Sequence, residues 1–223
     1  MNKTLIILSL VLLVSCAPPN EVPSSDLRER EYGITYEVNS QTPFTGSSVS
    51  SYENGQLKYK RNYKDGKQDG LYETYYENGQ LKSKENYKNE QPYGLWETYY
   101  ENGQLKSKEN YKNRGRHGLQ KEYYENGQLE SKENWKDGHA HGLTERYHKN
   151  GQLWIKWNYK NDELIEGEEK EYHENGQLKS KRHVKTKYGN YPVLIEEYDE
   201  NGYLKSKVCY REDEKRDMSY CEK

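Results

Sequence analysis

The Asn-Gly dipeptide recurs along this chain at a nearly fixed interval, and this repetition limits the fold more than any other feature. Seven copies occur, with steps of 24 residues four times and then of 25 and 26. Their glycines are Gly55, Gly79, Gly103, Gly127, Gly151, Gly176 and Gly202. Many copies of one short unit predict an array of stacked repeats rather than a single globular core.

Each unit is predicted to be a β-hairpin. Asn-Gly between runs rich in Tyr, Trp and Thr is typical of a type I′ turn, which needs positive φ at both central residues. In the unit GLWETYYENGQLKSKENYKN, a two-residue turn pairs Thr98 with Ser107 and Glu97 with Lys108, so that opposite charges meet across strands. A three-residue loop with a bulge would shift the pairing by one residue and put Tyr99 beside the leucine.

The repeat length selects the architecture. About 24 residues hold two strands and two turns, too few for a propeller blade of roughly 40 residues. We therefore expect an all-β, elongated tandem β-hairpin repeat array, an open meander or solenoid sheet, over residues 31–210. A strand is expected at residues 34–38, and the charged tail, residues 211–223, is expected to cover the terminal sheet edge.

Tyrosine makes such an array able to fold. Hydrophobic residues are 31% of the chain and charged residues 32%, a balance that alone would suggest disorder. The chain also has 24 tyrosines, whose large rings can form a thin core. A predicted aromatic stripe is either that core or an exposed recognition surface, and its members are Tyr72, Tyr76, Trp96, Tyr100, Tyr124, Trp135 and Tyr147.

The first residues predict export and lipidation. Residues 1–15 have the layout of a signal peptide, with an apolar run much shorter than the roughly 20 residues that span a bilayer. The segment Leu13-Val14-Ser15-Cys16 resembles the bacterial lipobox, which implies cleavage before Cys16 and its acylation. With Ala17 next, an outer-membrane or surface location in the cell envelope is favoured. Residues 16–30 are expected to be a flexible tether.

Several functional classes are disfavoured. Removing residues 1–15 takes away one of 35 basic residues and none of the 37 acidic ones, leaving 34 against 37 and no basic excess for nucleic acid. His117 and His141 align with Asp69 and Tyr93 of other units, so we expect no metal site and no cofactor. The carboxylates recur with lysine partners and no catalytic triad is present, so we expect no enzyme.

Besides Cys16, which is expected to be acylated, two cysteines remain after the predicted cleavage. Cys209 and Cys221 either form a disulfide, as an oxidising compartment permits, or are independent thiols.

The units GLYETYYENGQLK, at residues 70–82, and GLWETYYENGQLK, at residues 94–106, resemble the bacterial variant of the MORN repeat found in YwqK-type antitoxin proteins. The resemblance covers about residues 42–208. It implies a single-layer β-hairpin array, a non-enzymatic role and neutralisation of a toxin.

Together with the lipobox, the resemblance predicts a membrane-anchored scaffold that binds a protein partner, with an antitoxin-like or immunity-like role. The alternative is a structural envelope lipoprotein that binds cell-wall glycan or lipid headgroups. A secreted effector or adhesin is a third alternative.

Overall fold

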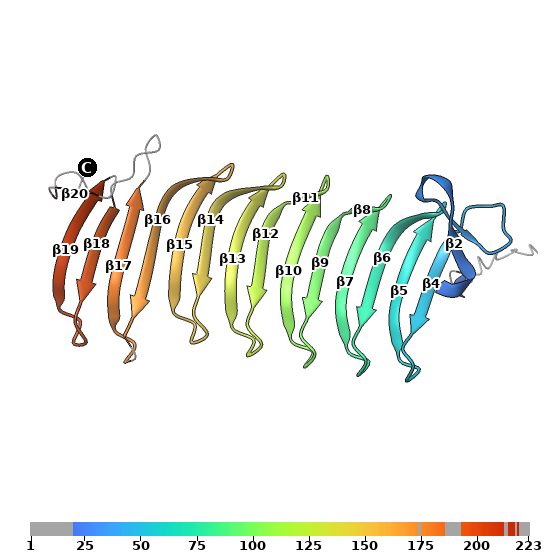
Figure 1. The fold of residues 1–223 in the computed structure, drawn as a ribbon, viewed down its shortest axis with the longest axis horizontal. Coiled ribbons are helices and arrows are strands. Elements are labelled where there is room, and N and C mark those ends of the chain that lie inside the picture. The colour runs from blue at the N-terminus through green and yellow to red at the C-terminus, as the bar shows by residue number, and fades with distance from the viewer. Residues whose placement is uncertain (1–19, 174, 186–192, 212–213, 217, 219–223) are drawn as a thin grey trace, which may run out of the picture.

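The computed structural model describes residues 20–173, 175–185, 193–211, 214–216 and 218, and in this part nearly all regular structure is β. Consecutive strands lie side by side in one long, twisted, 18-stranded sheet (Figure 1). The expectation of an elongated β-hairpin array is therefore confirmed. Its main strands are β4 (Gly46–Ser51), β5 (Leu57–Lys64), β6 (Lys67–Tyr75), β7 (Leu81–Lys88), β9 (Gly94–Tyr99), β10 (Leu105–Lys112), β12 (Gly118–Tyr123), β13 (Leu129–Lys136), β14 (His139–Tyr147), β15 (Leu153–Lys160), β16 (Glu163–Tyr172), β17 (Leu178–Lys185), β18 (Val193–Tyr198) and β19 (Leu204–Arg211).

The Asn-Gly turns differ from the predicted type I′ turn. Gly103 N donates to Tyr100 O and Tyr100 N donates to Gln104 O, both at 2.8 Å, which closes a three-residue loop. Gly103 has φ of 85°, whereas Asn102 does not have positive φ. This is a type I turn followed by a left-handed glycine. The Asn102 side chain accepts a hydrogen bond from Gln104 N at 2.9 Å, which fixes the asparagine in that turn.

The strand register combines both alternatives. Tyr99 pairs with Leu105, as a bulged hairpin predicts. A shift at Lys106 then restores the predicted pairs of Thr98 with Ser107 and of Glu97 with Lys108. The bulge absorbs the extra loop residue, so the charge pairs of the two-residue register survive.

Type I′ turns do occur, at the other ends of the strands, in a row opposite the Asn-Gly turns. We call these two rows of turns the type I′ edge and the Asn-Gly edge. Asn89 and Glu90 have φ of 49° and 63°, and they connect the paired residues Lys88 and Gln91. Positive φ at both central residues is the mark of this turn. The equivalent turns are Asp65-Gly66, Asn113-Arg114, Asp137-Gly138 and Asn161-Asp162. The adjoining short strands are β8 (Gln91–Pro92) and β11 (Gly115–Arg116).

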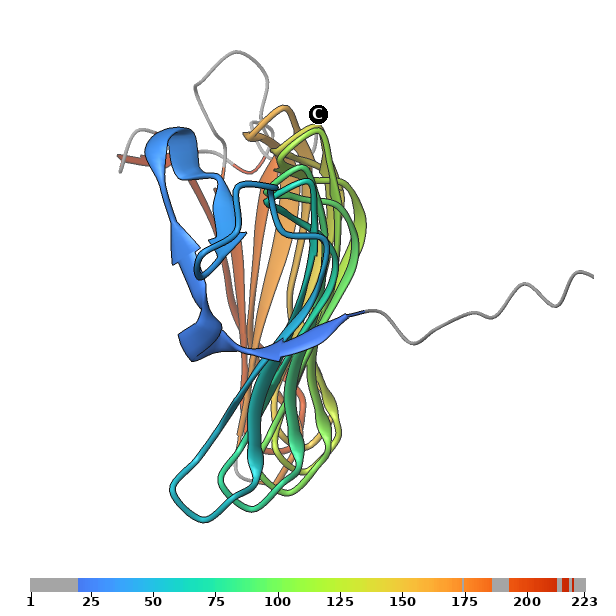
Figure 2. The ribbon, with the colours of Figure 1, turned by 90° about the vertical axis from the view of Figure 1, so that its right-hand side faces the viewer.

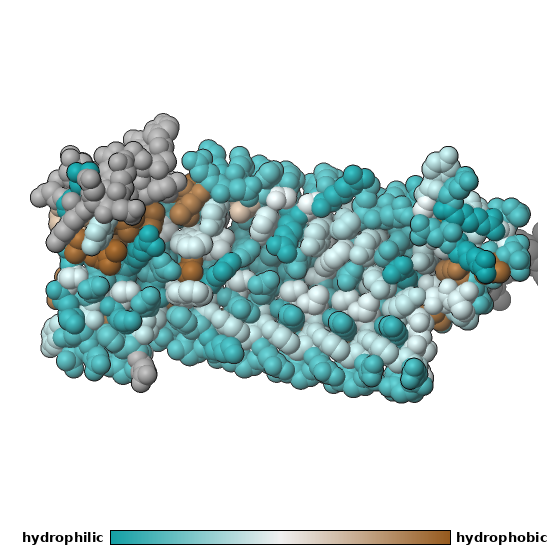
Figure 3. Space-filling model, in the orientation of Figure 1, coloured by the Kyte–Doolittle hydropathy of each residue, from teal (hydrophilic) through white to brown (hydrophobic). Residues whose placement is uncertain are grey.

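The two faces of the sheet differ in chemistry. On one face, here called the tyrosine face, ring contacts run from Tyr72 to Tyr87, Trp96 and Tyr111, with centroids 6.4, 5.2 and 4.7 Å apart. On the other, the ion-pair face, Glu97 lies 3.1 Å from Lys108. The space-filling view shows side chains of intermediate hydropathy gathered along the middle of one face (Figure 3).

The core of the array is a thin and largely polar strip. The hydroxyls of Thr98 and Ser107 are 2.7 Å apart, and Ser107 is almost fully buried. Hydroxyl pairs of this kind satisfy each other, so the tyrosine face can be covered without aliphatic side chains. Other buried side chains of the strip are Ser83, Gln120, Ser131, Thr144 and Ile155.

The N-terminal segment caps the first hairpin. β1 (Glu21–Pro23) pairs parallel with β4, and η1 (Ser24–Asp26), β2 (Leu27–Glu29), η2 (Glu31–Gly33) and β3 (Thr35–Glu37) follow. Figure 2 shows this segment folded across the end of the sheet. The tether predicted for residues 16–30 is therefore wrong for residues 20–30, because backbone pairing with β4 and burial of Val22 hold them. β3 confirms the strand expected at residues 34–38.

At the other end, β20 (Glu214–Arg216) pairs with β19, so part of the charged tail covers the terminal edge as expected. Cys209 is fully buried and disulfide-bonded. Its predicted partner Cys221, like the predicted signal peptide and Cys16, lies outside the described residues. Among the residues that are described, no helix has the length and apolar character to cross a membrane.

Candidate binding surface

The structure divides the predicted aromatic stripe among three places. Tyr72, Trp96 and Trp135 lie on the tyrosine face, where Arg116 stacks 5.2 Å from the Trp135 ring. Tyr147 lies on the ion-pair face and donates to Glu145 at 3.2 Å. The remaining three, Tyr76, Tyr100 and Tyr124, form a ladder beside the Asn-Gly turns. The prediction of a single stripe is therefore wrong. The bulge interrupts the alternation of side chains between the faces, and Tyr147 stands one position before the place that Tyr100 and Tyr124 hold in their repeats.

The tyrosine ladder joins successive repeats in the first four junctions. Tyr76 donates its hydroxyl proton to Tyr99 O at 2.8 Å, and Tyr100 donates to Tyr123 O at 2.7 Å. Burial raises the pKa of the Tyr76 and Tyr100 hydroxyls above the usual value, so both stay protonated donors at neutral pH. The other rungs are Tyr52, Tyr124 and His173.

A lysine covers each of the four tyrosine rungs, and at the fourth, Tyr124, it is Lys149 of the next turn, 5.8 Å from the ring centroid. The ammonium groups of Lys58, Lys82 and Lys106 lie 5.5, 5.5 and 5.6 Å from the ring centroids of Tyr52, Tyr76 and Tyr100. We call Lys58, Lys82 and Lys106 the lysine row. Lys82 and Lys106 are the residues skipped at the strand bulges, which explains why they sit beside Ser83 and Ser107 on the tyrosine face.

A groove of about 500 Å³ follows this row on the tyrosine face. Its floor carries the hydroxyls of Thr74, Ser83 and Thr98, and its walls include Tyr59 and Tyr72. A cavity of this volume is in the range of specific binding sites. Sequence reasoning missed the lysines because strict alternation assigns them to the opposite face.

The groove changes sign in the repeat at residues 116–137. Lys106 lines both the first groove and an adjoining hollow of about 320 Å³, which contains Glu109, Glu122 and Glu130. Glu130 stands where the two preceding repeats have Lys82 and Lys106. The groove therefore has a net positive charge over its first three rungs, where three lysines and one carboxylate, Glu85, line it. It becomes acidic beside and beyond the third rung, where the hollow holds Glu109, Glu122 and Glu130.

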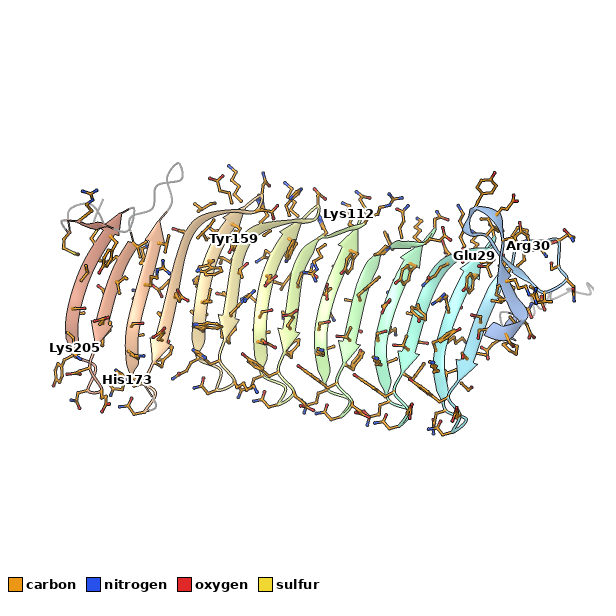
Figure 4. The ribbon with its side chains drawn as sticks, viewed as in Figure 1. Glu29, Arg30, Lys112, Tyr159, His173 and Lys205 are labelled. Atoms are coloured by element: carbon orange, nitrogen blue, oxygen red, sulfur yellow. The ribbon has the colours of Figure 1, made fainter. Side chains whose placement is uncertain are left out.

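A separate hollow of about 640 Å³ lies in the last repeats. Its lining includes His173 and Lys205, which lie at the Asn-Gly edge, opposite the edge that holds Lys112 (Figure 4). Here the cations have acidic neighbours: Lys179 lies 3.5 Å from Glu171 and Arg182 lies 3.8 Å from Glu169.

Arg61 is a further cation on the tyrosine face that the sequence did not single out. Its guanidinium lies 4.5 Å from the Tyr72 ring centroid and 5.6 Å from that of Tyr59, and its Nε is buried without a hydrogen-bond partner. The later repeats have Glu85 and Glu109 at this position. Arg61 thus adds a positive charge to the tyrosine face beside two rings that line the groove, whereas Glu85 at the equivalent position lines the groove itself.

Two histidines form polar contacts with aspartates of the type I′ turns. His139 Nδ1 lies 2.6 Å from Asp162, and this hydrogen bond, with one from Ala140 N, holds the pKa of the Asp162 carboxyl below its usual value. His117 Nδ1 lies 3.2 Å from Asp137 in the next turn. Over the described part of the chain, no three or more His, Cys, Asp or Glu side chains are grouped to hold a metal ion.

Comparison with known proteins identifies the repeat. The family model described as "MORN repeat variant" matches residues 44–65, 68–89, 92–113, 116–137, 140–161 and 165–186, which together cover more than half of the chain. A search of curated proteins finds no match.

Two solved structures share a general likeness with the chain. "Crystal Structure of TcdB2-TccC3-TEV" is 15% identical with a TM-score of 0.29, and the alignment covers 85% of this chain and 12% of that one. "Crystal Structure of TcdB2-TccC3" is 13% identical with a TM-score of 0.27, covering 82% of this chain and 13% of that one. The chain thus corresponds to a small part of either protein.

Proposed function

The chain belongs to the MORN repeat variant family, and from this premise we propose that it is a non-enzymatic scaffold that binds a protein partner through its tyrosine face. The observation that carries the proposal is the groove beside the tyrosine ladder, lined by half-buried rings, hydroxyls and lysines. Tyrosine and arginine are enriched where proteins bind each other, and lysine-lined rims set the approach of a charged partner.

The rings of the groove are already held in place. Tyr76 and Tyr100 are fixed by hydrogen bonds to the next repeat, and Trp96 donates to Asn86 O at 2.9 Å. A partner that contacts these rings loses little side-chain freedom on the scaffold side, which favours binding. This supports a recognition surface in addition to the structural role of the rings.

We propose that Cys16 is acylated and holds the scaffold at the cell envelope, so that the chain would exert its antitoxin-like or immunity-like role there, on a toxin or an envelope protein. Only four peptide bonds separate Cys16 from Asn20, where the described structure begins, and four residues span at most about 14 Å. The N-terminal end of the sheet would therefore lie close to the membrane. Replacing Cys16 with Ser should move the protein from the membrane fraction to the soluble fraction and abolish labelling by radioactive palmitate.

Site-specific cross-linking tests the binding face. A photo-crosslinking residue in place of Lys82 should capture one stoichiometric protein from the organism's own envelope extract. The same residue in place of Lys84, an exposed position two residues further along β7 and paired with Glu73 on the ion-pair face, is the matched control and should not. Equal capture from both positions, or none from either while the protein is retained on cell-wall sacculi, would contradict the proposal.

Retention on sacculi would favour the alternative, an envelope lipoprotein that binds cell-wall glycan. One observation supports it: His148 stacks on Trp154 with centroids 5.5 Å apart, next to Tyr172 at 6.2 Å. These rings line a shallow hollow of about 700 Å³ away from the lysine row.

A further inference from the structure

We propose that the cationic part of the groove binds an extended acidic segment of the partner in polyproline II conformation, with a carboxylate at every third residue. This inference rests on the proposed function and names the chemistry of the partner. The binding residues are the lysine row, Lys58, Lys82 and Lys106, together with the rings of Tyr52 and Tyr76 beneath two of the lysines.

The lysines of the row lack carboxylate partners. Among the ion pairs of the described residues, none includes Lys58, Lys82 or Lys106. On the ion-pair face, by contrast, Lys108 and Lys132 bind Glu97 and Glu145. The glutamates of the ion-pair face thus neutralise its lysines. In the groove, the carboxylate of Glu85 accepts a hydrogen bond from the Tyr87 hydroxyl at 2.8 Å, and the three lysines of the row remain outside these ion pairs.

The spacing of the row selects the conformation of the ligand. Successive lysines are one hairpin apart, and two strands at about 4.8 Å each place them about 9.6 Å apart along the array. A polyproline II helix has three residues per turn and rises about 3.1 Å per residue, so every third side chain returns to one face after about 9.3 Å. An extended β-strand repeats every second residue, at about 6.7 Å, and does not match.

The walls of the groove suit the same ligand. Polyproline II segments dock in grooves lined by aromatic rings, where their preformed backbone costs little entropy. Here the rings of Tyr59 and Tyr72 line the groove beside the ladder, and their edge-to-face contact at 6.1 Å keeps them in place.

The acidic hollow next to Lys106 limits how many carboxylates of the ligand can bind in the groove. Glu130 takes the place of a fourth lysine, and Glu122 lies in the same hollow. A fourth carboxylate in register would meet these two like charges against the one cation of Lys149 over the Tyr124 ring, so the row accepts three. A neutral or basic residue must follow in the partner.

Peptide binding to the full chain tests this assignment at low salt. The probe is a fluorescent nonapeptide with Glu-Pro-Pro repeated three times, and its control has the same composition with the three glutamates consecutive. The repeating peptide should bind about tenfold more tightly, because only it can place all three charges over the row. Equal affinity for the two peptides would overturn the proposal.

Two double variants distinguish binding by the lysine row from a nonspecific effect of net positive charge. Lys82→Gln with Lys106→Gln should lose about tenfold in affinity for the repeating peptide. Lys112→Gln with Lys136→Gln makes the same charge change at exposed positions of the opposite edge and should change it less than about twofold. Equal losses in the two double variants would also overturn it.

A gain of binding gives an independent check. Glu130→Lys should extend the row to four and bind a peptide of four Glu-Pro-Pro units more tightly than the wild-type chain does. Preferential binding of polygalacturonate over the repeating peptide would instead assign the row to an anionic glycan. A partner cross-linked from position 82 whose binding ignores Lys82→Gln with Lys106→Gln would refute this inference and leave the proposed function standing.

Discussion

Asn78 shows how much one residue contributes to this array. Its Oδ1 accepts a hydrogen bond from Gln80 N at 2.9 Å, which shapes its own turn. Its Nδ2 donates to Glu101 O at 3.2 Å in the following turn. The same side chain thus fixes a local conformation and a contact between repeats, and an aspartate could do only the first.

Arg114 occupies a position that suits glycine better. It is exposed and has φ of 70° in a type I′ turn, a conformation that costs about 1–2 kcal/mol for a residue with a Cβ. Glycine at this position would remove that cost, but part of the gain in stability is offset by the conformational freedom that glycine adds to the unfolded chain. Arg114→Gly should therefore raise the free energy of unfolding by about 0.5–1 kcal/mol in urea titrations.

The control for Arg114→Gly is Gln104→Gly, at an exposed residue outside the left-handed region. There only the entropic cost of glycine remains, and stability should fall by about 0.5–1 kcal/mol. Destabilisation by both changes would contradict the type I′ assignment of the Asn113-Arg114 turn.

At the residue scale, the sequence located the turns but not their types. Asn-Gly is compatible with a type I′ turn and with a type I turn ending in a left-handed glycine. The choice depends on the loop length, which is set by the pairing of Tyr100 with Gln104 across the sheet. The same bulge moves Lys106 to the tyrosine face, so the lysine row could not be read from alternation.

The hairpin is the element that the sequence predicted best. The cross-strand pairs Glu97 with Lys108 and Thr98 with Ser107 were predicted from a two-residue turn, and both are present although the loop has three residues. These pairs lie beyond the bulge, where regular antiparallel geometry returns. The alternation of side chains between the two faces predicts these pairs correctly, because side chains directly opposite each other on adjacent strands are in contact.

Lys121 breaks the pattern of opposite charges on the ion-pair face. It lies directly opposite Lys108 on one side and Lys132 on the other, at a position where other repeats have glutamate. Lys121→Glu should raise the free energy of unfolding by about 1 kcal/mol, because two repulsive pairs become attractive. Lys112→Glu, at an exposed strand end, should change it by less than about 0.5 kcal/mol in the same urea titration. Equal effects would contradict the register.

Acid should weaken the array through Glu145. The hydrogen bond from Lys132 holds the pKa of the Glu145 carboxyl below its usual value of 4.5. A lowered pKa in the folded state contributes stability above the unfolded value, and this is lost as pH falls through the folded value. Between pH 6 and pH 3 the wild-type chain should lose up to about 1 kcal/mol more than Glu145→Gln does, measured as urea midpoints. Parallel pH profiles would rule out this contribution.

At the scale of the whole molecule, the array has two ends and no single central core. Each hairpin packs only against its neighbours, and the buried strip runs from Ser83 to Ile155 without a central cluster. Repeat arrays of this kind unfold in parts, with stability set by neighbouring interfaces. The cap formed by residues 20–45 could not be predicted from the repeat, because it lacks the repeat pattern and depends on parallel pairing of β1 with β4.

Phe44 and Ile155 allow a comparison between the end and the middle of the array. Each is 4% exposed, and Phe44 contacts Tyr63 with ring centroids 5.7 Å apart. Phe44→Ala should cost about 3 kcal/mol locally and remove hydrogen-exchange protection mainly from β4 and β5. Ile155→Ala should act mainly on β14, β15 and β16. Loss of protection along the whole array in either variant would show a single cooperative unit.

The ladder contacts described above also bear on how a gene for such a protein can change. Tyr52, Tyr76, Tyr100 and Tyr124 each bond to the residue 23 positions later, so these four junctions between repeats use the same pair of positions. Duplication or deletion of one whole unit of coding sequence would keep the reading frame and rebuild an equivalent junction. Related genes can then differ in length by whole repeats, and in ligand choice by single codons such as that of Glu130.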